Sequence, residues 1–135
     1  MNTISANGGA LQPSKILCIG RNYTAHIEEL GNEIPDSMVV FNKPNSAISN
    51  TLYSDINNQP LHHQSELAFT VREGKLDAVG FGLDLTKRAL QSALRAKRLP
   101  WERAKVFDGA ALFSAFVALP QQTGIVHIVV TNVLQ

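Results

Sequence analysis

QSELAFTVREGKLDAVGFGLDLT, residues 64–86, is the stretch that decides the fold of this chain. Glu66–Val71 alternates in part between polar and apolar residues, and Ala78–Leu85 forms a second β-prone run. Glu73 and Gly74 lie between the two runs and are typical of a tight turn. The stretch therefore predicts a β-hairpin.

On both sides of this hairpin the sequence predicts short strands and one clear helix. Lys15–Gly20 is an apolar run that ends at a glycine, which is typical of a buried strand. Thr86–Leu99 is followed by Pro100 and predicts a helix, with Thr86 or Asp84 as its N-cap. Its predicted apolar stripe consists of Leu85, Ala89, Ala93 and Ala96. The other expected elements are a helix at Asn22–Leu30, strands at Met38–Phe41, Phe116–Leu119 and Ile125–Val130, and a surface loop at Asn45–Gln59. The fold class is α+β, with strands in the majority.

Length and charge narrow the class of protein. The chain has 135 residues, of which 44% are hydrophobic, so one modest core and a single domain are expected. Twelve basic and eleven acidic residues give a net charge of +1, which predicts no nucleic-acid partner and no attraction to anionic membranes. The longest apolar stretches, such as Ala110–Val117, are far shorter than the ~20 residues of a membrane span.

The N-terminal residues and the single cysteine predict the order of the chain's start and the compartment of the protein. Residues 1–12 are rich in Asn, Gly and Ser and have no apolar core, so they predict a flexible arm rather than a signal peptide, ahead of a domain at residues 13–135. Cys18 is the one cysteine and lies in a predicted strand, which indicates a buried, inert thiol. We therefore expect a reducing compartment, most simply the cytoplasm.

Two carboxylates and an amide could form a metal site. Gln64 and Glu66 are two residues apart on a strand and project from the same face, and hairpin pairing would bring Asp84 near them. Three oxygen ligands suit a hard cation such as Mg²⁺ or Mn²⁺. By spacing alone, the alternative remains that Glu66 is solvated and that Asp84 only caps the helix.

Other polar groups are weaker candidates when they are taken alone. His26 and Glu29 have the i, i+3 helical spacing with which a carboxylate orients a general base, but an exposed His beside a surface acid fits equally well. Lys105 lies among apolar neighbours, where an ammonium can stabilise an oxyanion. His62 and His63 have no partner at zinc spacing. The basic residues of the predicted helix lack aromatic interleaving and indicate a solvated face.

The order of five motifs resembles the fumarylacetoacetate hydrolase family. The motifs are KILCIGRNY (15–23) leading to His26 and Glu29, FNKP (41–44), HQSEL (63–67), GLDLTKRALQ (82–91) and LPWERAKVFDG (99–109). The resemblance covers roughly residues 13–120. It implies a β-rich roll with short peripheral helices and a homodimer.

The resemblance also implies a role for each matching residue. Gln64, Glu66 and Asp84 match metal ligands for Mg²⁺ or Mn²⁺, and His26 with Glu29 matches a water-activating dyad. Lys105 matches the lysine that stabilises substrate oxygens. Arg21, Asn22, Tyr23 and Lys43 match residues that line or support the pocket. The implied reaction is metal-dependent carbon–carbon cleavage of acylpyruvate-like 2-oxo acids, and an oxaloacetate-type decarboxylase is the variant that needs no water attack.

Three departures from the family pattern affect the expected activity. Gln64 replaces a Glu, Ala89 replaces an acid, and family domains continue for some 70 residues beyond the matched part, so the roll is expected to be incomplete at its C-terminus. We therefore expect very low hydrolase activity. The alternatives are a catalytically inactive remnant that serves as a binding or assembly domain, or an unrelated small-ligand-binding α+β domain.

Overall fold

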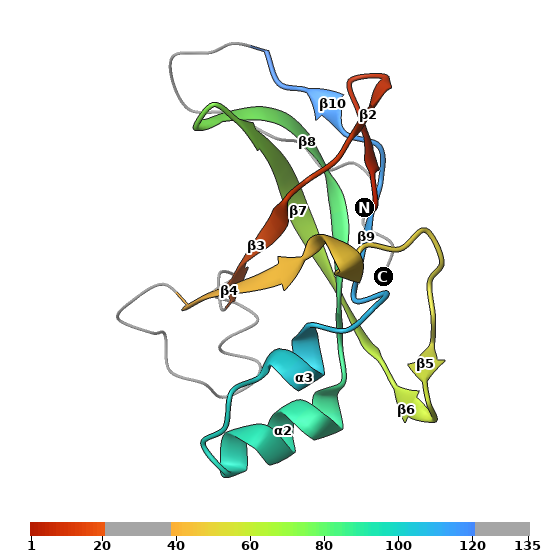
Figure 1. Cartoon of the computed structure of the whole chain (residues 1–135), viewed down its shortest axis with the longest axis vertical. Helices are drawn as coiled ribbons and strands as arrows, with labels where there is room; N and C mark the ends of the chain where they lie inside the picture. Colours follow the sequence, from red (N-terminus) through yellow and green to blue (C-terminus); the bar gives the residue numbers. More distant parts are fainter. Residues whose placement is uncertain (21–38, 121–135) are drawn as a thin grey trace.

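A computed structural model describes residues 1–20 and 39–120 of the chain (Figure 1). Strands predominate and are accompanied by two short helices, so the predicted α+β class is confirmed. The expected helix at Asn22–Leu30 and the expected strand at Ile125–Val130 lie outside the described residues. No helix in the described ranges is long and apolar enough to cross a membrane.

The predicted hairpin is the longest feature of the molecule. Strands β7 (His62–Arg72) and β8 (Lys75–Thr86) pair in antiparallel fashion, with one irregularity between Thr70 and Val71. Glu73 and Gly74 have φ angles of 50° and 75°, as a two-residue hairpin turn requires. The hairpin runs along most of the molecule, and the helices lie at its lower end in Figure 1.

Two short strands complete the main sheet on the other edge of β8. Strand β9 (Ala111–Phe113) pairs with Gly82–Asp84, and strand β10 (Val117–Ala118) pairs with Ala78–Val79. The predicted strand at Phe116–Leu119 is therefore present in shortened form. The pairing of β9 with the end of β8 fixes the backbone around Asp84.

The N-terminal residues form a hairpin where composition predicted a flexible arm. Strands β1 (Ile4–Ala6) and β2 (Gly9–Leu11) are joined by Asn7 and Gly8, which have φ angles of 52° and 76°. Asn-Gly is a strong signal for this turn, and it outweighs the polar composition. Ala6 packs with Ala78 and Phe116 in the core of the sheet. The expectation for residues 1–12 was therefore wrong.

Strands β3 (Lys15–Gly20) and β4 (Val39–Pro44) form a separate antiparallel ribbon with one buried side. Cys18 is opposite Phe41, and Ile16 is opposite Lys43, so all four side chains share the inward face. The alternation of half-buried and exposed residues along β3 follows the two-residue period of a strand. This ribbon brings Lys43 into the interior.

The segment after β4 is more structured than the predicted surface loop. It contains the 3-10 helix η1 (Asn45–Ala47) and the small hairpin of β5 (Asp55–Ile56) and β6 (Gln59–Pro60). Asn45 is buried, and its side-chain amide donates hydrogen bonds to the carbonyls of Asn2 and Pro13. These bonds satisfy the amide and attach the segment to the N-terminal residues.

The predicted helix begins later and buries a different face. Helix α2 spans Arg88–Ala96, and neither Thr86 nor Asp84 caps it, because residue 87 precedes the helix and gives no side-chain cap. Its buried residues are Gln91 and Leu94, whereas the predicted stripe residues Ala89, Ala93 and Ala96 are exposed. Tertiary contacts therefore override the alanine pattern.

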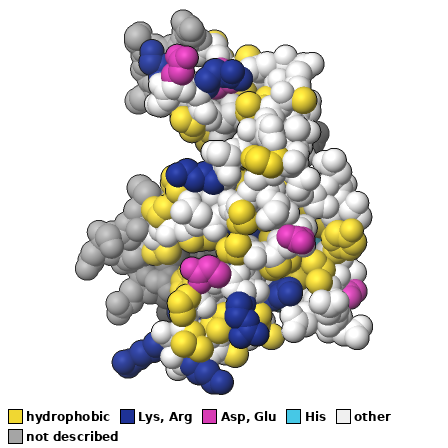
Figure 2. Space-filling view, in the orientation of Figure 1, with side chains coloured by type: hydrophobic (Ala, Val, Ile, Leu, Met, Phe, Trp, Pro, Cys, Tyr) yellow, Lys and Arg dark blue, Asp and Glu magenta, His cyan; other side chains and the backbone are white. Residues whose placement is uncertain are grey.

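A second helix, α3 (Glu102–Lys105), packs against α2 and β8. Lys87 lies 4.8 Å from the ring centroid of Phe107, and the Arg95 guanidinium lies 5.8 Å from that of Trp101. These cation–π contacts support the corner between the helices. Lys and Arg side chains gather at this end of the molecule (Figure 2). Helix α3 delivers Lys105 to the end of β8.

Candidate active site

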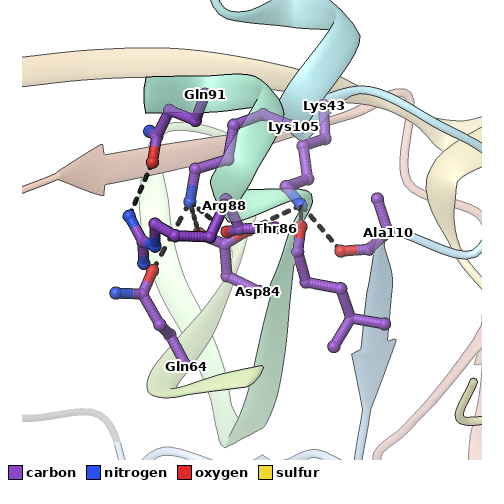
Figure 3. Close-up of polar contacts among 9 residues, drawn as sticks. Lys43, Gln64, Asp84, Thr86, Arg88, Gln91, Lys105 and Ala110 are labelled. Atoms are coloured by element: carbon purple, nitrogen blue, oxygen red, sulfur yellow. Dashed lines mark hydrogen bonds and ion pairs between the residues drawn. The ribbon is translucent and has the colours of Figure 1, made fainter. Parts of the chain in front are cut away.

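Asp84 lies between two lysines at the end of β8 (Figure 3). Its Oδ1 lies 2.6 Å from Lys43 Nζ, and its Oδ2 lies 2.5 Å from Lys105 Nζ. Both lysine side chains are almost fully buried, and the Asp84 side chain is 12% exposed. Buried charges are retained only when they are paired, so the three groups form one electrostatic unit.

Lys43 is held from three sides. Besides its ion pair with Asp84, its ammonium donates hydrogen bonds to the carbonyl oxygens of Leu85, at 3.2 Å, and Ala110, at 2.7 Å. Burial lowers the pKa of Lys43 below its ordinary value, and the Asp84 carboxylate opposes this shift. Lys43 thereby joins β4 to β8 and to the loop before β9, with its ammonium surrounded by one carboxylate and two carbonyl oxygens.

Lys105 has a looser set of partners. Its ammonium donates to Asp84 Oδ2 and, at 2.7 Å, to Thr86 Oγ1, but Gln64 Oε1 is 3.4 Å away. The ammonium also lies 5.2 Å from the centroid of the Phe41 ring. One of its three protons is therefore only weakly bound by protein and can be redirected to an oxygen of a bound anion.

The three predicted metal ligands share one face of the β7–β8 hairpin. Gln64 is directly opposite Asp84, and Glu66 is two residues further along β7. Gln64 and Glu66 are both half-buried. Among the described residues, no three His, Cys, Asp or Glu side chains converge on a metal position, because the third member of this set is an amide.

The chemistry of this donor set fits a hard divalent cation. Two carboxylates and an amide oxygen are all oxygen donors, as Mg²⁺ and Mn²⁺ prefer. The contact with Lys105 points the amide oxygen of Gln64, rather than its NH₂ group, toward the same ammonium that Asp84 contacts. Gln64, Glu66 and Asp84 are therefore the residues that would hold the ion.

The sequence predicted only a capping role for Thr86 and no role in the site for Arg88 and Gln91. Thr86 is fully buried, and its hydroxyl accepts a hydrogen bond from Lys105. Arg88 Nη1 donates to Gln91 Oε1 at 2.6 Å, beside Gln64 in Figure 3. The spacing of Thr86, Arg88 and Gln91 after Asp84 was visible as a motif, but only the fold shows which partners the three side chains contact.

Cys18 lies on the inward face of β3, near the cluster. Burial, followed by the negative charge of Asp84, raises the pKa of its thiol to about 11. A thiol with so high a pKa is protonated at neutral pH and is a poor nucleophile. Its environment agrees with the predicted inert role.

The other predicted site residues are not brought to the cluster by the described part of the chain. Arg21, Tyr23, His26 and Glu29 lie outside the described residues, so their predicted roles stay predictions. His62 and His63 are exposed, and His63 Nε2 lies 3.3 Å from the carbonyl oxygen of Tyr53.

Comparison with known proteins places this chain in a family. Residues 15–131 match the model of the fumarylacetoacetate (FAA) hydrolase C-terminal family. The chain is 35% identical over 127 residues to oxaloacetate tautomerase YcgM from Escherichia coli, covering 82% of this chain and 57% of the relative. It is 34% identical over 118 residues to a mitochondrial oxaloacetate decarboxylase from Dictyostelium discoideum, covering 76% of this chain and 54% of that protein.

Solved structures show the same fold. A fumarylacetoacetate isomerase/hydrolase-type protein from Oleispira antarctica superposes with a TM-score of 0.83 at 36% identity, covering 91% of this chain and 62% of that chain. A fumarylpyruvate hydrolase from Pseudomonas aeruginosa, in complex with Mn²⁺ and pyruvate, superposes with a TM-score of 0.73 at 27% identity. The superposition covers 87% of this chain and 59% of that chain. The chain thus spans little more than half the length of the relatives that it matches. It belongs to the fumarylacetoacetate hydrolase family.

Proposed function

We propose that the cluster of Gln64, Glu66, Asp84 and Lys105 is an active site for a small 2-oxo acid of the oxaloacetate type. The reaction passes through an enol or enolate, as in tautomerisation or decarboxylation. The names of several curated relatives support this choice over carbon–carbon hydrolysis. The observation that carries the proposal is the weakly held third proton of Lys105 beside the oxygen donors.

The mechanism follows from the contacts of the lysines. When bound, a divalent cation such as Mg²⁺ or Mn²⁺ supplies Lewis-acid polarisation of the 2-oxo group. Lys105 directs a proton toward the oxygen on which negative charge develops and stabilises the enolate. Asp84 and Thr86 orient the Lys105 ammonium, and Lys43 fixes Asp84 from its other side.

The originally expected reaction, hydrolysis of an acylpyruvate, is the second candidate. The fumarylpyruvate hydrolase among the solved relatives, with Mn²⁺ and pyruvate bound, favours it. In this reaction a water adds to the distal carbonyl, and the carbon–carbon bond breaks to give an acid and the enolate of pyruvate. It requires a base that removes a proton from water, a role that the family pattern gives to His26 with Glu29. Arg21 and Tyr23 would contact the substrate.

The chain's own length bears on whether it acts alone. Because it spans little more than half of its relatives, a non-catalytic folded domain remains the alternative to an enzyme. We expect a homodimer, as the family resemblance implies.

The test compares three reactions of the purified chain in the presence of Mn²⁺ or Mg²⁺. Ultraviolet absorbance follows enol-to-keto conversion of oxaloacetate, coupled pyruvate detection follows decarboxylation, and loss of the diketone chromophore follows acylpyruvate cleavage. Lys105→Met should strongly reduce the activity, whereas Lys75→Met, at the exposed hairpin turn, should leave it intact. Acylpyruvate cleavage without oxaloacetate turnover would favour the second candidate, and no turnover of either would reject both.

A further inference from the structure

The charges of the candidate site balance without a metal ion. Among the described residues of the cluster, Lys43 and Lys105 carry two positive charges, and Glu66 and Asp84 carry two negative charges. Gln64 occupies the third ligand position and is neutral. A divalent cation that enters this cluster therefore meets no net negative charge, although its oxygen donors are in place.

The ammonium groups of both lysines are held in place by burial and by their contacts. Lys43 is 1% exposed and has three acceptors, so it cannot swing out of the cluster. Lys105 is 5% exposed and is held by Asp84 and Thr86. Because the described residues of the cluster are in charge balance, we expect the ligand to supply the negative charge that the cation needs.

We infer that the divalent cation and the 2-oxo acid bind this chain with strong positive coupling, and that Gln64 is the residue that imposes it. This inference rests on the proposed function. A dicarboxylate that chelates the cation brings two negative charges, which compensate the two positive charges of the cation, while Glu66 and Asp84 continue to balance the two lysines. Each ligand then binds weakly alone and tightly when the other is bound. Thermodynamic linkage requires the acid to raise the affinity for the cation by the same factor as the cation raises the affinity for the acid.

A substitution at residue 64 should uncouple the two ligands. Gln64→Glu adds one negative charge directly opposite Asp84, in a side chain of nearly the same shape. The cation is then attracted without help from the acid. In this variant the acid no longer has to supply all of the negative charge that the cation needs, so binding of the acid should raise the cation affinity by a smaller factor.

The experiment measures free Mn²⁺ by electron paramagnetic resonance during titration of the full chain, with and without oxalate as a 2-oxo acid mimic. A protein-free titration corrects for the Mn²⁺–oxalate complex. For the natural chain, oxalate should tighten Mn²⁺ binding by tenfold or more. Gln64→Glu should bind Mn²⁺ alone at least tenfold more tightly than the natural chain, with a smaller effect of oxalate. Gln59→Glu, on exposed strand β6, makes the same charge change elsewhere and should resemble the natural chain.

Each remaining outcome has a defined meaning. Equal Mn²⁺ affinity of the natural chain with and without oxalate would overturn the coupling but leave the proposed metal site intact. Binding by Gln64→Glu alone, with none by the natural chain in either condition, would also overturn it. Failure of every variant to bind Mn²⁺, even with oxalate, would reject the proposed metal-dependent function itself, and the inference with it.

Discussion

Lys43 Nζ lies 2.6 Å from Asp84 Oδ1, and this ion pair joins a lysine of β4 to a carboxylate at the end of β8. The lysine side chain is 1% exposed and the carboxylate 12% exposed. A charge pair so far from water is not a strong source of net stability, but the loss of one member is costly. The pair therefore controls both the fold around the site and the position of Asp84.

Substitution of Lys43 by Met should destabilise the chain by about 3 kcal/mol, because it leaves Asp84 with one countercharge and removes the ammonium that donates to the carbonyls of Leu85 and Ala110. Urea unfolding followed by circular dichroism measures the change. Lys75→Met, at the exposed turn, is the control and should change stability by less than ~0.5 kcal/mol. An unchanged midpoint for Lys43→Met would show that the ion pair does not form.

The Lys105→Met substitution should lower turnover of oxaloacetate by roughly 10²–10³-fold, because it removes the donor to the developing oxyanion. Its effect on KM should be smaller, since the contact strengthens in the transition state. Steady-state kinetics at saturating Mn²⁺ measures both parameters. A rise in KM alone would instead make Lys105 a binding residue.

Alkylation of Cys18 should report its raised pKa. The rate of reaction with iodoacetamide should keep rising up to about pH 11, whereas an unperturbed cysteine levels off nearer pH 9. Mass spectrometry of samples quenched at intervals gives the rates, and circular dichroism checks that the chain stays folded. A plateau near pH 9 would mean that the thiol is not buried as described.

The same thiol should affect stability at alkaline pH. Because the native state keeps the Cys18 proton above the pH at which the unfolded chain loses it, the native state binds more protons between about pH 9 and 11. Stability should therefore fall as pH rises through this window. The buried Lys43 acts in the opposite direction, because its pKa is lowered by folding. Comparing Cys18→Ala with the natural chain across this range isolates the thiol contribution.

A glycine on β8 is required by close packing. A Cβ at Gly80 would lie 3.1 Å from atoms of the Phe116 ring, which is buried in the core. Gly80→Ala should destabilise the chain by roughly 1–3 kcal/mol, since the ring has to move in a packed interior. Gly9→Ala, where the nearest atom is 3.8 Å away, should be neutral or slightly stabilising. Thermal unfolding of both variants tests the difference.

Local patterns predicted part of the fold well. The β7–β8 hairpin, its Glu73-Gly74 turn and strand β3 all follow from alternation and turn residues. The Asn7-Gly8 pair is also typical of a hairpin turn, but the polar composition of residues 1–12 led to the prediction of a flexible arm. The predicted buried face of α2 was wrong, because Gln91, a polar residue hydrogen-bonded to Arg88, is buried while three alanines of the helix are exposed.

For the candidate site, the sequence by itself determined which side chains share a face, because the two-residue period of a strand and the register of a tight hairpin are local properties. That sufficed to place Gln64, Glu66 and Asp84 together. Only the tertiary structure decided that Asp84 is an ion-pair centre rather than a helix cap. Lys43 and Lys105 reach it from a separate ribbon and a later helix. Such contacts depend on how the elements pack, and the desolvation of charge that makes them necessary arises only when the packing excludes water.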